Sequence, residues 1–222
     1  VKGRPSDNPL IVHVSSLEQM KSLCKTFPEQ AQKLFDAFMP GPLTVVLPKS
    51  DIIPKEISGA LDTVALRLPE NEVARELISQ AGVPIAAPSA NLSGSPSPTT
   101  AQHVYDDLSG RIPLILDGGP CRVGVESTVI TLCTNPPTLL RPGGITLEQL
   151  RAVLGEVAVH PSVLDGVKLD KVASPGMKYK HYSPKARVVI AMGEDMTKAI
   201  NTLYDKAVAK GVRVCIFSRE DR

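Results

Sequence analysis

Apolar and polar residues along this chain recur with two periods, one typical of β-strands and one typical of α-helices. Short apolar runs bounded by turn residues predict strands at residues 10–14, 43–47, 63–68, 83–87, 127–132 and 138–140. Longer segments with apolar residues three and four apart predict helices at residues 29–39, 70–81, 100–108 and 147–154. Because the two types alternate, we expect an α/β domain with a twisted, mixed sheet and helices around it.

Capping and turn residues mark where several of these elements begin or end. Ser15 followed by Glu18 predicts a capping box at the start of a short helix that includes residues 20–24. Pro28 suits the start of the helix at 29–39, which Pro40 ends. Thr146 is predicted to cap the helix at 147–154.

The pattern changes after residue 157. It fades over residues 157–184, and then residues 186–192, 196–210 and 212–217 predict a strand–helix–strand unit. That spacing suits a parallel crossover, which would open a Rossmann-like domain. We therefore expect a first domain at residues 1–160, a linker at 161–184 and the beginning of a second domain at 185–222. Both ends look cut, because the chain starts inside a motif and stops just after a predicted strand.

Composition restricts the choice of partners. The formal net charge of +2 provides no strong overall field to gather nucleic acid, and aromatic residues are scarce, with no Trp, four Phe and four Tyr. This argues against a base-stacking platform for single strands, so weak RNA binding would need a local basic patch.

Cysteine usage and hydropathy predict a compartment. Cys24, Cys121, Cys133 and Cys215 lie far apart and form no C-x-x-C pair, which argues against a structural metal site and favours reduced thiols. No apolar run is long enough to span a membrane, and no signal peptide is visible. We expect a cytoplasmic protein that supplies no metal ligands of its own.

Two cations near the start of the chain are candidates for phosphate binding. The sequence has neither a P-loop nor a G-x-G-x-x-G fingerprint, so scattered groups would have to hold a nucleotide. Lys2 and Arg4 offer a point charge and a planar fork, with Pro5 and Pro9 stiffening the segment. The alternative is a solvated basic tip.

Strand phase singles out one histidine and one arginine. His13 points away from the face that residues 10, 12 and 14 share, and Arg67 points away from the face of residues 64, 66 and 68. Both side chains project from otherwise apolar strands, as they would in the wall of a polar cavity. The alternative is that these faces meet solvent.

Hydroxyl and turn-forming residues are dense just after the strand at 83–87. Residues 88–96 read Pro-Ser-Ala-Asn-Leu-Ser-Gly-Ser-Pro, which differs from a G-x-S-x-G nucleophile elbow, and no Ser-His-Asp set stands out. A loop whose side chains satisfy its own backbone is the alternative. Taken alone, Ser127 in a strand and Arg141 before a turn are ordinary surface features.

Three motifs in this order resemble a known family. They are Lys-Gly-Arg-Pro-Ser-Asp-Asn-Pro-Leu at 2–10, the segment at 88–96, and Glu-Ser-Thr-Val at 126–129 leading to Arg-Pro-Gly-Gly at 141–144. Over residues 2–184 the chain resembles the YrdC-like synthases that make threonylcarbamoyl-adenylate for tRNA modification. The His-Tyr pair within residues 174–184 resembles the linker motif of the family's longer, two-domain members. A strand and turn that precede the first motif in the family are absent from this sequence.

The resemblance implies a fold and residue roles. It implies a YrdC-like domain whose sheet and helices surround a concave cavity. ATP contacts are implied for Lys2, Arg4, Asn8, Thr63, Ser89, Ser97, Arg141, His181 and Tyr182, with Lys2 and Arg4 also catalytic. Threonine contacts are implied for His13, Arg67, the backbone of Ala87, and Ser127. The linker would lie over the active site as a lid, although simple anchoring of an interdomain segment remains the alternative for its aromatic and histidine residues.

The implied reaction joins L-threonine, bicarbonate and ATP into threonylcarbamoyl-AMP and pyrophosphate, for use by a downstream tRNA-modifying transferase complex. Two anions must meet, so cations, with Mg²⁺ bridging the phosphates, would screen their repulsion and hold the attack geometry. No general base stands out. Two other classes stay open: a carbamoyl-adenylate-handling domain of hydrogenase maturation, and a non-enzymatic RNA-binding module.

Overall fold

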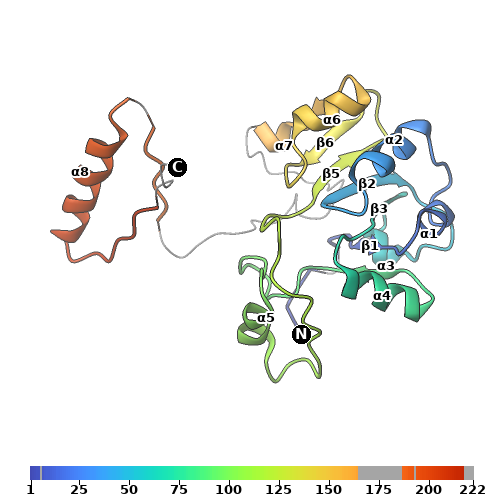
Figure 1. The fold of residues 1–222 in the computed structure, drawn as a ribbon, viewed down its shortest axis with the longest axis horizontal. Coiled ribbons are helices and arrows are strands. Elements are labelled where there is room, and N and C mark those ends of the chain that lie inside the picture. Colours follow the sequence, from blue (N-terminus) through green and yellow to red (C-terminus); the bar gives the residue numbers. More distant parts are fainter. Residues whose placement is uncertain (6, 165–186, 193, 218–222) are drawn as a thin grey trace. The chain divides into compact units, whose positions relative to one another are not determined.

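The computed structural model describes residues 1–5, 7–164, 187–192 and 194–217. The chain divides into two compact units, Val1–Ser183 and Pro184–Arg222. The first unit contains the sheet and helices α1 to α7, and the described part of the second contains helix α8 (Figure 1).

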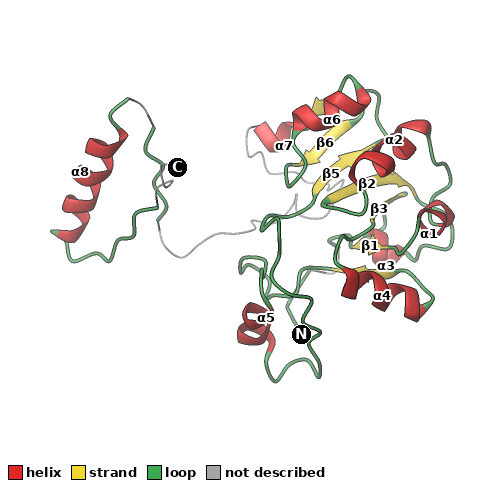
Figure 2. Cartoon of the chain, viewed as in Figure 1, coloured by secondary structure: helices red, strands yellow, loops and turns green. Residues whose placement is uncertain are grey.

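Strands and helices alternate along the first unit, as the periodicity predicts (Figure 2). The strands are β1 Ile11–His13, β2 Leu43–Pro48, β3 Thr63–Arg67, β4 Ile85–Ala87, β5 Thr128–Thr131, β6 Thr138–Arg141 and β7 Ala158–Val159. The helices are α1 Leu17–Ser22, α2 Glu29–Phe38, α3 Lys55–Ser58, α4 Glu72–Ala81, α5 Ala101–Leu108, α6 Leu147–Leu154, α7 Pro161–Leu164 and, in the second unit, α8 Met196–Val208. The short elements α3, β7 and α7 had no periodic signal in the sequence.

The seven strands form one mixed sheet in the order β4-β1-β3-β2-β5-β6-β7. Strand β1 runs parallel to β3, β2 parallel to β5, and β6 parallel to β7, while the other neighbours are antiparallel. The predicted α/β domain with a mixed sheet is therefore confirmed.

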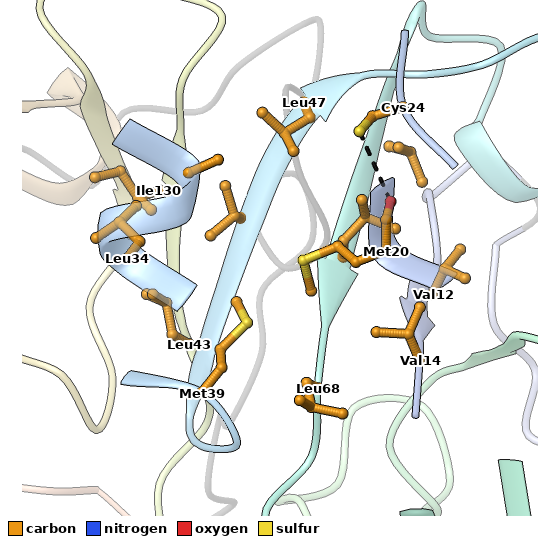
Figure 3. Packing of buried hydrophobic residues seen from close by; sticks show 14 of the residues in the cluster. Val12, Val14, Met20, Cys24, Leu34, Met39, Leu43, Leu47, Leu68 and Ile130 are labelled. Carbon is orange, nitrogen blue, oxygen red and sulfur yellow. Dashed lines mark hydrogen bonds between the residues drawn. The ribbon is translucent and has the colours of Figure 1, made fainter. Parts of the chain in front are cut away.

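One face of the sheet carries the main hydrophobic core. Side chains from β1, β2, β3, β5 and β6 pack there against Met20 of α1, Leu34 of α2 and Leu150 of α6, as the close-up of part of this cluster shows (Figure 3). All three of these helix residues are at most 1% exposed. Burying a side chain of this size contributes about 1.5–3 kcal/mol, so this layer holds the strands in place.

The other face of the sheet is different in character. Its apolar cluster contains only Val46, Ala65, Val129 and Leu140, with Ile11 packed against it. Because side chains alternate along a strand, the remaining positions of the same phase point to this second face, which we call the polar face. A core on one side thus leaves the other side free to hold polar groups.

The sequence correctly predicted one helix cap and misplaced another. Thr146 forms a full capping box with Gln149 at α6, as expected. At α1 the cap is Ser16, not Ser15, because the Ser16 hydroxyl accepts from the backbone N–H of Gln19. The Gln19 side chain turns back and accepts from the N–H of Ser15 at 2.9 Å, so it takes the role predicted for Glu18.

The predicted strand–helix–strand unit is only partly correct. Helix α8 lies where it was expected, but residues 187–192 and 212–217 form no strand within the described residues. A strand needs a hydrogen-bonded neighbour, and the apolar residues here are exposed, as at Ile190 (79%) and Phe217 (93%). The Rossmann-like character of this unit stays a prediction.

A pair of glycines after β6 fixes the start of β5. The N–H of Gly144 donates to the carbonyl oxygen of Glu126 at 3.1 Å. A Cβ at Gly143 would overlap that carbonyl oxygen and the amide nitrogen of Thr128. The turn therefore needs a residue without a side chain, because its backbone lies directly on residues 126–128.

We expect Gly143→Ala to lower the free energy of unfolding by at least about 2 kcal/mol, because only backbone movement relieves the overlap. Gly110→Ala is the control for an open position: nothing lies within 4 Å of the added Cβ, and its positive φ (+71°), which Gly143 does not share, adds only a backbone cost. Urea unfolding of both variants measures the difference. Equal stability of the two would show that the contact with residues 126–128 does not constrain the turn.

Candidate active site

Strand pairing gathers the predicted site residues at one end of the polar face. His13 lies directly opposite Arg67 in the parallel β1–β3 pair, and Arg141 lies opposite Val129 in the β5–β6 pair. Thr44 of β2 also pairs with Val129, and Ser127 immediately precedes β5. Side chains from residues distant in the sequence thus share one end of one face.

The Arg67 guanidinium is anchored at one nitrogen only. Its Nε donates to the carbonyl oxygen of Gly41 at 3.1 Å, and no other described group bonds to its terminal nitrogens. Burial lowers the pKa of Arg67, and the nearby charge of Arg141 lowers it further. The terminal nitrogens are therefore two donors with a fixed orientation, positioned to take a carboxylate.

His13 is uncharged at neutral pH. Burial, followed by the charge of Arg67, lowers the pKa of His13 to about 4, although the carbonyls of Ile85 and Ile11 act in the opposite direction. A neutral imidazole beside a guanidinium avoids like-charge repulsion, and it keeps one ring nitrogen as an acceptor.

The Arg141 guanidinium, in contrast, is bound within the protein. Its Nε and Nη2 donate to the carbonyl oxygen of Ser127 at 3.1 and 2.8 Å, and Nη2 also donates to the Ser127 hydroxyl at 3.0 Å. Its Nη1 lies 3.1 Å from Oε2 of Glu126. The Ser127 hydroxyl bonds in turn to that of the fully buried Thr44 at 2.8 Å. Neither Glu126 nor Thr44 was singled out from the sequence.

A second cluster holds the N-terminal cation Lys2. Its Nζ donates to the carbonyl oxygen of Ser89 at 2.7 Å and lies 3.4 Å from Oδ1 of Asn91. Burial lowers the pKa of Lys2, and the charge of Arg4 lowers it further. The N-terminal segment is paired with this loop, since the N–H of Ser93 donates to the Lys2 carbonyl at 2.9 Å. Lys2 is therefore held at the loop and is no solvated tip.

The loop at 88–96 is partly satisfied by its own groups. Asn91 donates to the carbonyls of Leu92 and Ser95, both at 2.8 Å, as the structural alternative predicts. The N–H of Leu92 donates to Asp107 of α5 at 2.9 Å. Figure 1 accordingly shows the N-terminus close to α5. The loop thus has a structural role, and it also places Ser89 at Lys2.

Arg4 and Asn8 have polar atoms that are buried and unused. Arg4 donates through Nη2 to the carbonyl oxygen of Pro9 at 2.7 Å. Its Nε and Oδ1 of Asn8 are buried with no hydrogen-bond partner among the described residues. Buried polar groups are nearly always paired, so these two atoms are exceptions among the described residues.

The remaining predicted residues occupy different parts of the polar face. Ala87 lies opposite Ile11 at the end of β4, and the Ser97 hydroxyl donates to Oε1 of Glu126 at 3.1 Å. Thr63 starts β3, at the end of the strand away from Arg67, and lines a cavity of about 560 Å³ with Val46, Thr131, Leu140 and His160, among others. Thr63 is therefore separated from the arginine pair. The predicted linker residues His181 and Tyr182 lie outside the described residues.

The described residues contain neither a cluster of metal ligands nor a membrane-spanning helix. No group of three or more His, Cys, Asp or Glu side chains is arranged to hold a metal ion there. In the same residues, no helix has the length and hydrophobicity that crossing a bilayer requires.

Comparison with known proteins shows the family of this chain. Residues 1–143 match the Sua5/YciO/YrdC family model, described as telomere recombination, and residues 145–222 match the model described as the C-terminal domain of threonylcarbamoyl-AMP synthase. Among curated proteins, threonylcarbamoyl-AMP synthase of Pyrococcus abyssi is 52% identical over 96% of this chain and 63% of its own length. The Bacillus subtilis protein of the same name is 48% identical over 100% of this chain and 63% of its own length.

A solved structure supports the fold. The crystal structure of P. abyssi Sua5 complexed with L-threonine matches with a TM-score of 0.91 and 48% identity, over 99% of this chain and 66% of that one. This chain thus spans about 63% of the length of the two curated relatives. It belongs to the Sua5/YciO/YrdC family, in the long form that carries a Sua5-type C-terminal domain.

Proposed function

We propose that this chain carries the active site of a threonylcarbamoyl-AMP synthase, which joins L-threonine, bicarbonate and ATP and releases pyrophosphate. The observation that carries the proposal is the Arg67 guanidinium, anchored at Nε and unpaired at its ends among the described residues, beside neutral His13. The relatives that match over almost the whole chain are named for this activity, and one solved relative was crystallised with L-threonine.

The threonine subsite is built around Arg67. Its terminal nitrogens would hold the carboxylate through two parallel hydrogen bonds, which give affinity and orientation together. Neutral His13 adds no positive charge against the amino group of the substrate. The hydroxyl of Ser127 and the backbone of Ala87 complete the walls on the same face.

The proposed nucleotide subsite is built from the cations of the N-terminal segment and of β6. Lys2, Arg4 and Arg141 would contact the phosphates, together with the hydroxyls of Ser89 and Ser97. The unused amide oxygen of Asn8 is an acceptor at the same subsite. The cavity beside Thr63 has apolar walls and threonine hydroxyls suited to the nucleoside.

Catalysis here rests on position and charge. The carbamate formed from threonine and bicarbonate must approach a phosphate, and cations reduce the repulsion between these anions. The low pKa of His13 makes it a weak base, so no strong general base is at hand. Mg²⁺ would enter with ATP and neutralise phosphate charge, since the described residues form no carboxylate cluster for it.

The chemistry of the proposed product indicates which kind of enzyme would use it. A mixed anhydride of a carbamate and AMP is labile in water, so a transferase that modifies tRNA must take it directly or soon after release. We place the enzyme in the cytoplasm, with this transferase complex as its partner. Weak RNA binding by the lysine and arginine side chains of the proposed nucleotide subsite is the alternative role. Such binding would depend strongly on salt concentration.

The direct test of function follows an AMP-linked product by chromatography and mass spectrometry. We expect the full chain to convert labelled ATP only when L-threonine and bicarbonate are both present. Conversion without threonine, or with glycine in its place, would contradict the proposal. RNA binding with a steep salt slope and no turnover would favour the RNA-binding module.

Replacing Arg67 separates the two subsites. We expect Arg67→Ala to weaken threonine binding by about 2–4 kcal/mol, because a charge-assisted bidentate contact is lost, and to leave ATP binding nearly unchanged. Isothermal calorimetry with each ligand measures both. The matched control is Lys33→Ala, whose side chain is 53% exposed and pairs with Glu29 on α2, the helix that packs on the core face of the sheet. Unchanged threonine affinity in Arg67→Ala would remove the carboxylate role.

His13 should make the fold sensitive to acid. Its pKa is about 4 in the folded state and near the ordinary value of 6.5 when unfolded, so unfolding takes up a proton between these values. Stability is therefore complete above about pH 6.5 and falls as pH drops, by about 1–2 kcal/mol at pH 5. His13→Gln should lose less stability over this range in urea unfolding. His103→Gln, at an exposed position of α5, should behave as the parent does, and a matching loss in His13→Gln would contradict the assignment.

A further inference from the structure

The carboxylate of Glu126 lies among the groups that would bind phosphates. Its Oε2 is 3.1 Å from Nη1 of Arg141, and its Oε1 accepts from the Ser97 hydroxyl at 3.1 Å. Burial and Arg4 lower the pKa of Lys2, and the charge of Glu126 acts on Lys2 in the opposite direction. Each of these three partners belongs to the proposed nucleotide subsite, so a fixed negative charge lies where an anionic ligand is expected.

Backbone contacts keep Glu126 in this place. Its carbonyl oxygen accepts from Gly144 at 3.1 Å, and Gly143 packs on it so closely that a Cβ would not fit. The ion pair with Arg141 is sheltered, with side chains 26% and 16% exposed. The Arg122–Glu70 pair, in contrast, is exposed to 81% and 47%. A sheltered pair is screened less by water and salt, so the charge of Glu126 acts more strongly on its neighbours than an exposed charge would.

Hydrogen bonding leaves one route for a phosphate to reach Arg141. Nε and Nη2 are engaged by Ser127, which is 2% exposed and immediately precedes β5. Nη1 is engaged by Glu126. Four of the five N–H donors of this guanidinium are thus engaged, and the one left is the second N–H of Nη1. A phosphate oxygen that binds there lies beside the Glu126 carboxylate, whose negative charge repels it.

We propose that Glu126 is a positioning residue that occupies the anion site in the absence of ligand and competes with the phosphates of ATP and pyrophosphate. It holds Arg141 and Ser97 in the orientation that a phosphate needs. It also weakens the binding of every phosphate anion, which helps pyrophosphate to leave. This inference rests on the proposed function. It adds that the carboxylate of Glu126 limits the affinity of the site for nucleotides.

The charge can be removed with little change of shape. Glu126→Gln keeps an amide oxygen for Ser97 and loses the repulsion toward phosphate. We expect ATP and pyrophosphate to bind about 5- to 20-fold more tightly, with a lower KM for ATP and an unchanged or lower kcat because product leaves slowly. A merely structural role predicts the opposite, since a disturbed site binds its ligand more weakly. Glu126→Asp keeps the charge and should bind both anions within about threefold of the parent.

The experiment is calorimetric titration of the full chain with inorganic pyrophosphate and, separately, with ATP at low salt. Glu29→Gln is the matched control, because it removes one carboxylate of an exposed ion pair on α2, which packs on the core face of the sheet, and should bind as the parent does. Tighter binding confined to Glu126→Gln supports the proposal. Equal or weaker binding by folded Glu126→Gln, or binding by Glu126→Asp as tight as that of Glu126→Gln, overturns it. If the parent binds neither anion, the nucleotide subsite itself is wrong and both proposals fall.

Discussion

Two guanidinium groups share one face of one sheet, and the rest of the site follows from that repulsion. Burial lowers the pKa of both Arg67 and Arg141, and the charge of Arg141 lowers the pKa of Arg67 further. Arg141 is compensated internally by Glu126 and by the Ser127 carbonyl. Among the described residues, the one hydrogen bond of the Arg67 guanidinium is to the carbonyl of Gly41. The uncompensated cation is the one that needs an anion from outside, which makes it the natural place for a substrate carboxylate.

The sheet can hold these charges because its two faces have separate tasks. The main core packs against α1, α2 and α6 and supplies the stability. The polar face has a smaller apolar cluster and leaves room for side chains with fewer neighbours. His13 illustrates the cost of this arrangement, since an imidazole enclosed next to a cation must stay neutral. Strained or unpaired polar groups of this kind are tolerated where function requires them and packing elsewhere provides the stability.

Residues of the loops serve the fold and the candidate site at the same time. Asn91 satisfies the backbone of its own loop, and that same loop positions Ser89 against Lys2. The glycine pair at 143–144 is required by close backbone approach, and the approach fixes Glu126 and Ser127. A turn that follows β6 therefore also fixes the residues before β5 that contribute to the binding site.

The sequence by itself determined the order of the main elements, several of their ends and the strand phase that sets His13 and Arg67 apart from the core. These properties are local, because periodicity and capping depend on residues within a few positions. Motif resemblance supplied the roles of residues that are ordinary in isolation, such as Arg141. The resemblance gave no role to Glu126, although this residue begins one of the motifs, and it did not include Thr44, which looks like an ordinary buried strand residue.

Only the tertiary structure decided which strands are neighbours. The parallel β1–β3 pair places His13 beside Arg67, and the β2–β5 and β5–β6 pairs bring Thr44, Ser127 and Arg141 together. The same constraint explains the absence of strands at 187–192 and 212–217 in the described part of the second unit, despite their apolar sequence. Strand pairing is a contact between residues far apart in the chain, so it leaves no local signal and is settled only when the hydrogen-bonding partners meet.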